Sequence, residues 1–167
     1  MTMKKTTICY IENNGSWLML YRDRKKGDMN EGKWISVGGK VEAGETPDEC
    51  VTREVLEETG LILRSWVFHG IIEFRSDVYE DEDMYLYSSS DFVPADEAAA
   101  RIFAATGKYR PPECSEGELF WVPHEKMLDL PTWEGDRAFL TEILKGTKEI
   151  NMTLYYDKDE HCTIIKK

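Results

Sequence analysis

The sequence predicts an α/β (α+β) sandwich built around a mixed β-sheet. Strand-like runs come first, one well-capped helix lies between residues 46 and 60, and further strands precede a late helix. We find neither an internal repeat nor a linker. The length of 167 residues suits one hydrophobic core and is short for two ordinary domains. We therefore expect a single domain over residues 1–167.

The N-terminal part is predicted to form a hairpin followed by a short strand. The runs 6–11 and 17–22 are rich in residues that favour strands, and the Asn-Asn-Gly segment between them tolerates the positive φ of a tight turn. A polar loop over 23–33 then leads into a short strand at 34–37.

The clearest helix of the sequence lies between Thr46 and Gly60. Thr46 is a good N-cap, Pro47 suits the first helical position, and Glu49 completes a capping box with Thr46. Gly60 stands where a helix ends in the left-handed conformation.

The rest of the chain is predicted to alternate between strands and helices. In chain order we expect strands at 61–74 and 84–93, an Ala-rich helix at 94–106 ended by Gly107, a strand at 120–122, an amphipathic helix at 133–144, and a hairpin of 152–156 and 162–165. The Ala-rich helix is expected to be a solvated insert, with a lid or a dimer element as the alternatives.

The net charge limits the classes of binding partner, and the cysteines and the first residues indicate the cellular compartment. The 21 basic and 32 acidic side chains give a net charge of −11, which repels duplex nucleic acid and anionic membranes. A small phosphorylated substrate remains compatible if cations neutralise its approach. The first residues lack the apolar stretch of a secretory signal, no run of ~18 apolar residues occurs, and the four cysteines form no close pair. We expect a cytoplasmic protein with reduced thiols.

Three carboxylates share one face of the predicted helix 46–60. At ~100° per residue, Glu54, Glu57 and Glu58 fall within an arc about 100° wide, and Arg53 lies just outside it. Like charges at these spacings oppose helix formation, so the cluster makes physical sense if hard divalent cations such as Mg²⁺ fill it. Spacing alone leaves an ordinary charged surface helix as the alternative.

A glycine-rich turn precedes this helix and extends the pattern. Its glycines allow a carbonyl to point inward and a phosphate to approach closely. Turn and helix together resemble the signature of the Nudix hydrolases, which here has the form Gly39-x5-Glu45-x7-Arg53-Glu54-Val55-Leu56-Glu57-Glu58-Thr59-Gly60-Leu61.

The resemblance implies a Nudix-type α/β/α sandwich that hydrolyses a nucleoside diphosphate linked to another moiety. It implies Mg²⁺, or Mn²⁺, as the cofactor, with a ligand set made of the Gly39 carbonyl, Glu54, Glu57, Glu58 and Glu116. Glu116 is chosen over the nearby Glu113 and Glu118 because it lies just before the strand at 120–122.

The resemblance also implies catalytic roles for Arg53, Glu54 and Glu57. Arg53 would orient the carboxylates, Glu45 would brace the loop, and Glu54 would ligate a metal or accept the proton of the attacking water. Metals neutralise the phosphate chain and lower the pKa of a bound water, and a nearby carboxylate then takes its proton.

Two further segments, 31–42 and 131–136, resemble the MutT-related 8-oxo-dGTP diphosphatases, with Gly135 before a single aspartate as in the bacterial members. These enzymes release pyrophosphate and leave the monophosphate. The resemblance implies that Trp133 stacks on a purine and that Asp136 hydrogen-bonds its edge. Arg22 and Lys40 are further substrate-binding candidates. The alternatives are a core anchor for Trp133 and a surface charge for Arg22.

A small nucleotide is therefore the expected partner of a monomer or homodimer. Three other functions remain open. The first is the same chemistry on ADP-ribose or another nucleoside diphosphate derivative, the second is a nucleotide-sensing module without turnover, and the third is an acidic protein-interaction domain.

Overall fold

The computed structural model describes residues 3–24 and 26–167. Its strands are β1 (Lys4–Asn13), β2 (Ser16–Tyr21), β3 (Trp34–Ser36), β4 (Leu61–Ser76), β5 (Glu82–Pro94), β6 (Glu118–Pro123), β7 (Met152–Tyr156) and β8 (Cys162–Lys166). Its helices are α1 (Pro47–Thr59), α2 (Glu97–Thr106) and α3 (Asp136–Leu144), with a 3-10 helix, η1, at His124–Asp129.

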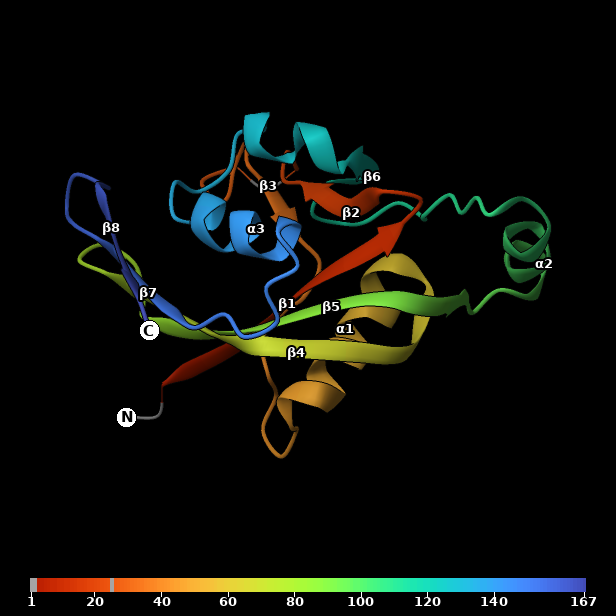
Figure 1. Ribbon diagram of the computed structural model, residues 1–167, viewed down its shortest axis with the longest axis horizontal. Helices are drawn as coiled ribbons and strands as arrows, with labels where there is room; N and C mark the ends of the chain where they lie inside the picture. Colours follow the sequence, from red (N-terminus) through yellow and green to blue (C-terminus); the bar gives the residue numbers. More distant parts are fainter. Residues whose placement is uncertain (1–2, 25) are drawn as a thin grey trace.

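The strands form a mixed sheet in the order β3-β2-β1-β5-β4-β7-β8, with β6 paired to β2. The pairs β1–β5 and β4–β7 are parallel, whereas β4–β5 and β7–β8 are antiparallel. Figure 1 shows α1 on one side of β1, β5 and β4, and α3 on the other. The predicted sandwich with a mixed sheet is confirmed.

Each side of the sheet has its own apolar core. Beneath α1, Val51 and Val55 pack with Leu61 of β4 and with buried residues of β1 and β2. On the side of α3, Phe139 and Leu140 pack with buried residues that include Tyr10, Trp17, Ile72, Leu86 and Trp133. The central strands therefore carry buried residues on both faces.

The predicted caps of α1 are confirmed. The Thr46 hydroxyl accepts a hydrogen bond from the Glu49 amide at 3.1 Å, and the Glu49 carboxylate accepts one from the Thr46 amide at the same distance. Gly60 ends the helix with a φ of 73°. The first hairpin also turns where expected, with φ values of 51° at Asn14 and 74° at Gly15.

The late helix was predicted to begin at Trp133, and this start is wrong. Residues 133–135 form a turn instead, in which the Asp136 amide donates to the Trp133 carbonyl at 3.0 Å. The indole of Trp133 is drawn into the core, and the Gly135 amide donates to the Tyr156 hydroxyl at 2.7 Å. These contacts with distant strands determine where α3 begins. The helix η1 was not predicted.

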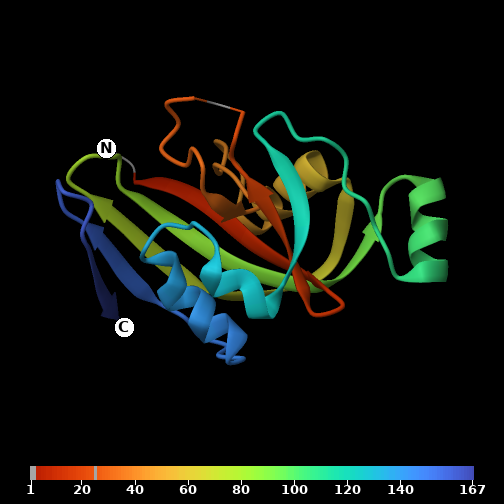
Figure 2. The same ribbon diagram turned by 90° about the horizontal axis from the view of Figure 1, so that it is seen from above.

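The Ala-rich helix is shorter than its predicted range of 94–106. Pro94 is the last residue of β5, and Asp96 caps α2 by accepting a hydrogen bond from the Ala99 amide at 2.9 Å. The helix ends at Gly107 as expected. None of its residues is buried, and Figure 2 shows it projecting from one end of the molecule.

The lengths of the helices and the state of the cysteines bear on membranes and on disulfides. Within residues 3–24 and 26–167, the helices are all too short or too polar to cross a bilayer. All four cysteines lie in this described part and none forms a disulfide.

Candidate functional site

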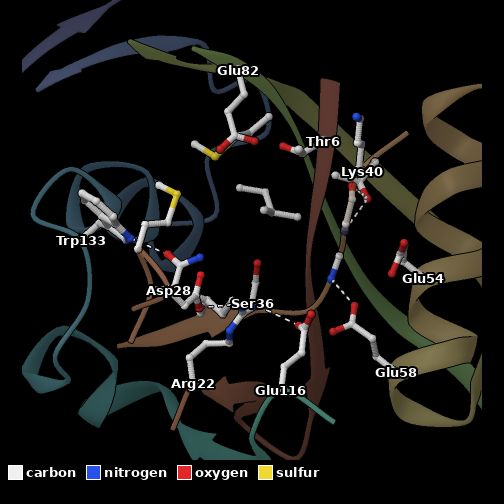
Figure 3. A pocket seen from close by; sticks show the side chains of 18 of the residues that line it. Thr6, Arg22, Asp28, Ser36, Lys40, Glu54, Glu58, Glu82, Glu116 and Trp133 are labelled. Carbon is white, nitrogen blue, oxygen red and sulfur yellow. Dashed lines mark hydrogen bonds and ion pairs between the residues drawn. The ribbon is translucent and has the colours of Figure 1, made fainter. Parts of the chain in front are cut away.

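A cleft of about 680 Å³ opens beside β1, between the C-terminal half of α1 and the turn before α3. Figure 3 shows its two ends, with Glu54 and Glu58 at one and Trp133 at the other. The structure brings nearly all the predicted site residues to its walls, namely Arg22, Gly39, Lys40, Glu54, Glu57, Glu58, Glu116, Trp133 and Asp136.

Arg53 is not part of the cleft wall but lies behind the carboxylates and joins them. Its Nε and Nη2 atoms donate to the Glu45 carboxylate at 2.7 and 3.0 Å. Its Nη1 atom donates to Glu54 at 2.8 Å and to Glu57 at 3.2 Å. Because Arg53 and a backbone amide donate to Glu45, the pKa of that carboxyl falls to about 2. One guanidinium therefore holds three acidic side chains in a fixed arrangement.

Glu58 is the most deeply placed carboxylate of the cluster. Its Oε1 atom accepts a hydrogen bond from the Gly38 amide at 2.9 Å. Burial, aided by the negative charges of Glu54 and Glu116, raises the pKa of Glu58 to about 8, although the Gly38 amide and the charge of Arg22 oppose the shift. Burial likewise raises the pKa of Glu54, although Arg53 opposes the shift. The cluster is thus rich in negative charge that the protein compensates only in part.

Two glycines allow the turn before α1 to approach both β1 and the cluster. Gly38 has a φ of 146°, and a Cβ there would lie 1.9 Å from the carbonyl oxygen of Thr7. A Cβ on Gly39 would lie 2.5 Å from the carboxyl carbon of Glu54. The Gly39 carbonyl, a predicted metal ligand, accepts a hydrogen bond from the Thr7 amide at 2.8 Å. One of its lone pairs is therefore directed at β1.

The donor set at this end of the cleft fits a hard divalent cation. Its side-chain donors are carboxylate oxygens from Glu54, Glu57 and Glu58, the ligand type that Mg²⁺ and Mn²⁺ favour. The pKa of Glu58 is raised chiefly by burial, which the Gly38 amide and Arg22 offset only in part, and a cation beside it would favour the ionised form.

Glu116 and Arg22 meet at the edge of the same cluster. Arg22 Nη1 donates to Glu116 Oε2 at 2.8 Å, and Arg22 Nη2 lies 2.6 Å from Asp28 Oδ2. The Arg22 side chain is only 12% exposed, so the alternative of a surface charge is wrong. Of the other two candidates, Glu113 lines the cleft and Glu118 pairs with Arg24 at 3.8 Å.

Trp133 lies at the other end of the cleft in an aromatic cluster. Its ring makes edge-to-face contacts with Phe74, Tyr79 and Tyr156 at centroid distances of 5.9, 5.8 and 5.2 Å. The indole nitrogen donates to Asn30 Oδ1 at 2.6 Å. Trp133 is 8% exposed and lines the cleft, so it anchors the core and also forms part of the cleft wall.

Asp136 begins α3 beside Trp133 and lines the cleft. Burial raises its pKa from 3.8 to about 7; the charge of Glu82 adds to this shift and that of Lys33 opposes it. Near neutral pH the carboxyl can therefore both donate and accept a hydrogen bond.

The raised pKa of Asp136 predicts a pH dependence of stability. Between pH 3.8 and about 7 the folded protein keeps a proton that the unfolded chain releases. The free energy of unfolding should therefore fall as pH rises across this window, by up to about 1.4 kcal/mol per pH unit from this group. Urea unfolding at several pH values should show this slope reduced in Asp136→Asn, and equal slopes in both proteins would contradict the assignment.

Sequence reasoning missed the cleft residues Asp28, Asn30 and Glu82. Asp28 and Asn30 lie in the polar loop 23–33, which has no periodic pattern. Asn30 is 103 positions from Trp133, and only the fold brings them together. Glu82 belongs to the acidic run 77–83, and nothing in the sequence distinguishes it from the other acidic residues of that run.

The sequence and the fold were compared with those of known proteins. A family model described as the NUDIX domain matches residues 2–143. An oxidized purine nucleoside triphosphate hydrolase of Danio rerio is 35% identical over 167 residues, which cover 99% of this chain and 93% of that protein. A nucleoside triphosphatase NudI of Enterobacter sp. is 32% identical over 149 residues, which cover 83% of this chain and 96% of that protein.

A similar fold occurs in the crystal structure of the mutator MutT protein from Bacillus halodurans. The two structures superpose with a TM-score of 0.79 over 99% of this chain and 98% of that one. Their sequence identity is 22%, so this likeness concerns the fold alone.

Proposed function

The chain belongs to the Nudix family, and from this premise we propose that it is a Mg²⁺-dependent or Mn²⁺-dependent pyrophosphohydrolase of nucleoside triphosphates, acting as a single domain over residues 1–167. Its products would be the monophosphate and pyrophosphate, and oxidised purine nucleotides are its proposed substrates. The names of the Danio rerio and Enterobacter relatives support this substrate class.

The observation that carries the proposal is the arrangement of the cleft. A cluster of carboxylates fills one end, and an indole with a nearby carboxyl group fills the other. A nucleotide has the matching polarity, because its charged phosphate chain needs cations and its base needs stacking and hydrogen bonds.

We assign the following roles to the residues of the cleft. Glu57 and Glu58 hold the cations with Glu54, and Arg53 fixes their orientation from behind. Glu54 accepts the proton of the attacking water, because Gly39 leaves its carboxylate free to approach the turn. When bound, the cations neutralise charge on the phosphate chain and acidify a coordinated water.

At the other end, Trp133 stacks on the base and the Asp136 carboxyl contacts the base edge. A protonated Asp136 can donate to a carbonyl oxygen of the base, whereas an ionised one can only accept. Lys40 is exposed beside the carboxylate cluster and is assigned to the phosphate chain.

A substrate panel tests this function. Pyrophosphate release is measured from 8-oxo-dGTP, dGTP and dATP with Mg²⁺ or Mn²⁺, and phosphorus-containing products are followed for ADP-ribose and a dinucleoside polyphosphate. Preferential release from 8-oxo-dGTP supports the proposal. Equal rates on all triphosphates would exclude a preference for oxidised purines. Faster cleavage of ADP-ribose would indicate that nucleoside diphosphate derivatives are the substrates instead.

Binding without any hydrolysis would instead indicate a nucleotide-sensing module. The complete set of glutamates in the cleft argues against that outcome, because a module that only binds nucleotides has no need for a water-activating carboxylate.

A further inference from the structure

A chain of polar contacts runs along the wall of the cleft from its carboxylate end to its indole end. It begins where Glu116 accepts a hydrogen bond from Arg22 at 2.8 Å and continues to Asp28, 2.6 Å from the other end of the guanidinium. Two residues further along the sequence, Asn30 accepts the indole N–H of Trp133 at 2.6 Å. Figure 3 shows Arg22 between Glu116 and Asp28.

Arg22 is also fixed to the same loop through its backbone. Its amide donates to the Lys33 carbonyl at 3.0 Å, and its carbonyl accepts from the Gly32 amide at 2.7 Å. The Nη1 and Nη2 atoms of its guanidinium each lie against one carboxylate, whereas its buried Nε atom has no hydrogen-bond partner. Its main chain holds the far end of the loop 28–33. The side-chain exposures of 12% for both Arg22 and Asp28 place this ion pair away from bulk solvent, where charges are screened least.

The loop 28–33 is compact and delivers Asn30 to the indole. The Glu31 amide donates to the Asp28 carbonyl, and the Lys33 amide donates to the Asn30 carbonyl, each at 2.9 Å. These two tight turns leave little freedom between Asp28 and Asn30. Asp28 and Asn30 therefore lie in one short segment whose backbone is held at both residues.

We propose that Arg22 is a positioning residue that sets the orientation of Trp133 through Asp28 and Asn30 and does not itself contact the nucleotide. Arginine suits this task because its planar guanidinium reaches two carboxylates at once, which a lysine ammonium does in a far less defined geometry. Through Glu116, the same residue ties the base end of the cleft to the carboxylate cluster. The inference about nucleotide binding rests on the proposed function, whereas the inference about Trp133 does not.

The first experiment measures the indole N–H of Trp133 in the ligand-free protein by NMR, with the resonance assigned by Trp133→Phe. In Arg22→Met and Asp28→Asn, this resonance should shift and exchange with solvent roughly 5- to 30-fold faster, because the acceptor is no longer held in place. Arg64→Met is the matched control, because Arg64 pairs with Asp91 on β5 at an exposed site. It should leave the Trp133 resonance unchanged.

The second experiment separates positioning from phosphate contact. Binding of the nucleoside 8-oxo-2′-deoxyguanosine, which carries no phosphate, is measured together with the KM for 8-oxo-dGTP. If Arg22 acts through Trp133, Arg22→Met weakens binding of the nucleoside and raises the KM for 8-oxo-dGTP by a similar factor. If Arg22 contacts phosphate, only the KM rises, and this result overturns the proposal. Lys40→Met serves as the reference for a loss confined to the triphosphate.

Asn30→Ala leaves the Arg22 ion pairs in place. It tests whether the indole of Trp133 is oriented through Asn30 even if Arg22→Met does not fold. It should reproduce the shifted indole resonance, and adding Asp28→Asn to it should cause no further change. An unchanged resonance in Asn30→Ala, or fully additive effects, would overturn the proposal. Should the wild-type protein hydrolyse no triphosphate, the proposed function fails while the indole measurement still decides the role of Asp28 and Arg22.

Discussion

Replacing Glu58 by Gln is expected to lower the turnover of a nucleoside triphosphate by roughly 10²- to 10³-fold, since cation binding supplies several kcal/mol to the transition state. The amide oxygen can still accept the Gly38 N–H, so the turn before α1 keeps its anchor. What is lost is the anionic ligand at the most deeply placed position of the cluster. Initial rates with saturating Mg²⁺ give the measurement.

The same variant should not be less stable than the wild type. The Glu58 carboxyl is buried near the charges of Glu54 and Glu116 and has a pKa of about 8, so near neutral pH without metal it is mostly neutral and a neutral amide replaces it at little cost. Thermal unfolding without added metal tests this, and Glu149→Gln at an exposed site serves as the control for activity. Full activity in Glu58→Gln would remove this residue from the cation site, and a large loss of stability would make the activity result uninformative about ligation.

Gly39→Ala is expected to reduce turnover by a comparable factor, through Glu54. The added Cβ would fall 2.5 Å from the Glu54 carboxyl carbon, and the flexible carboxylate must move away from the turn. If Glu54 accepts a proton from water, its displacement costs on the order of 10²-fold or more. Because the clash involves only the far end of a side chain, the free energy of unfolding should change little.

Gly38→Ala is the contrasting variant at the neighbouring position. Here the Cβ would meet backbone, 1.9 Å from the Thr7 carbonyl oxygen, at a φ of 146° that other residues rarely adopt. We expect this variant to lose stability as well as activity, as measured by urea unfolding and initial rates. If Gly39→Ala proved as destabilising as Gly38→Ala, its loss of activity would no longer point to Glu54.

The parts of the fold that the sequence predicted well are those determined by short-range patterns. The capping box at Thr46, the turn at Asn14 and the end of α1 at Gly60 depend on residues within a few positions of each other. The carboxylate face of α1 follows from helix periodicity alone. The carboxylate end of the cleft could therefore be anticipated from local spacing.

The parts that were missed or misplaced depend on residues far apart in the sequence. The start of α3 is determined by the contact of Gly135 with Tyr156, 21 positions later. The burial of Arg22 depends on Glu116, 94 positions away, and the polar character of the loop 23–33 gave no sign of this partner. Local propensity has no access to such contacts, so the indole end of the cleft was predicted only through resemblance.

The helix α2 has no buried residue, and it touches the core beneath α1 through Phe103, which stacks on Phe92 of β5 at a centroid distance of 5.3 Å. Segments with so few tertiary contacts open at a small fraction of the global unfolding energy. A protease at low concentration should therefore cut first within residues 95–108, leaving two fragments that stay associated through the sheet. Because α2 has no buried residue and projects from one end of the molecule, a reporter peptide could be inserted into it without disturbing the cleft.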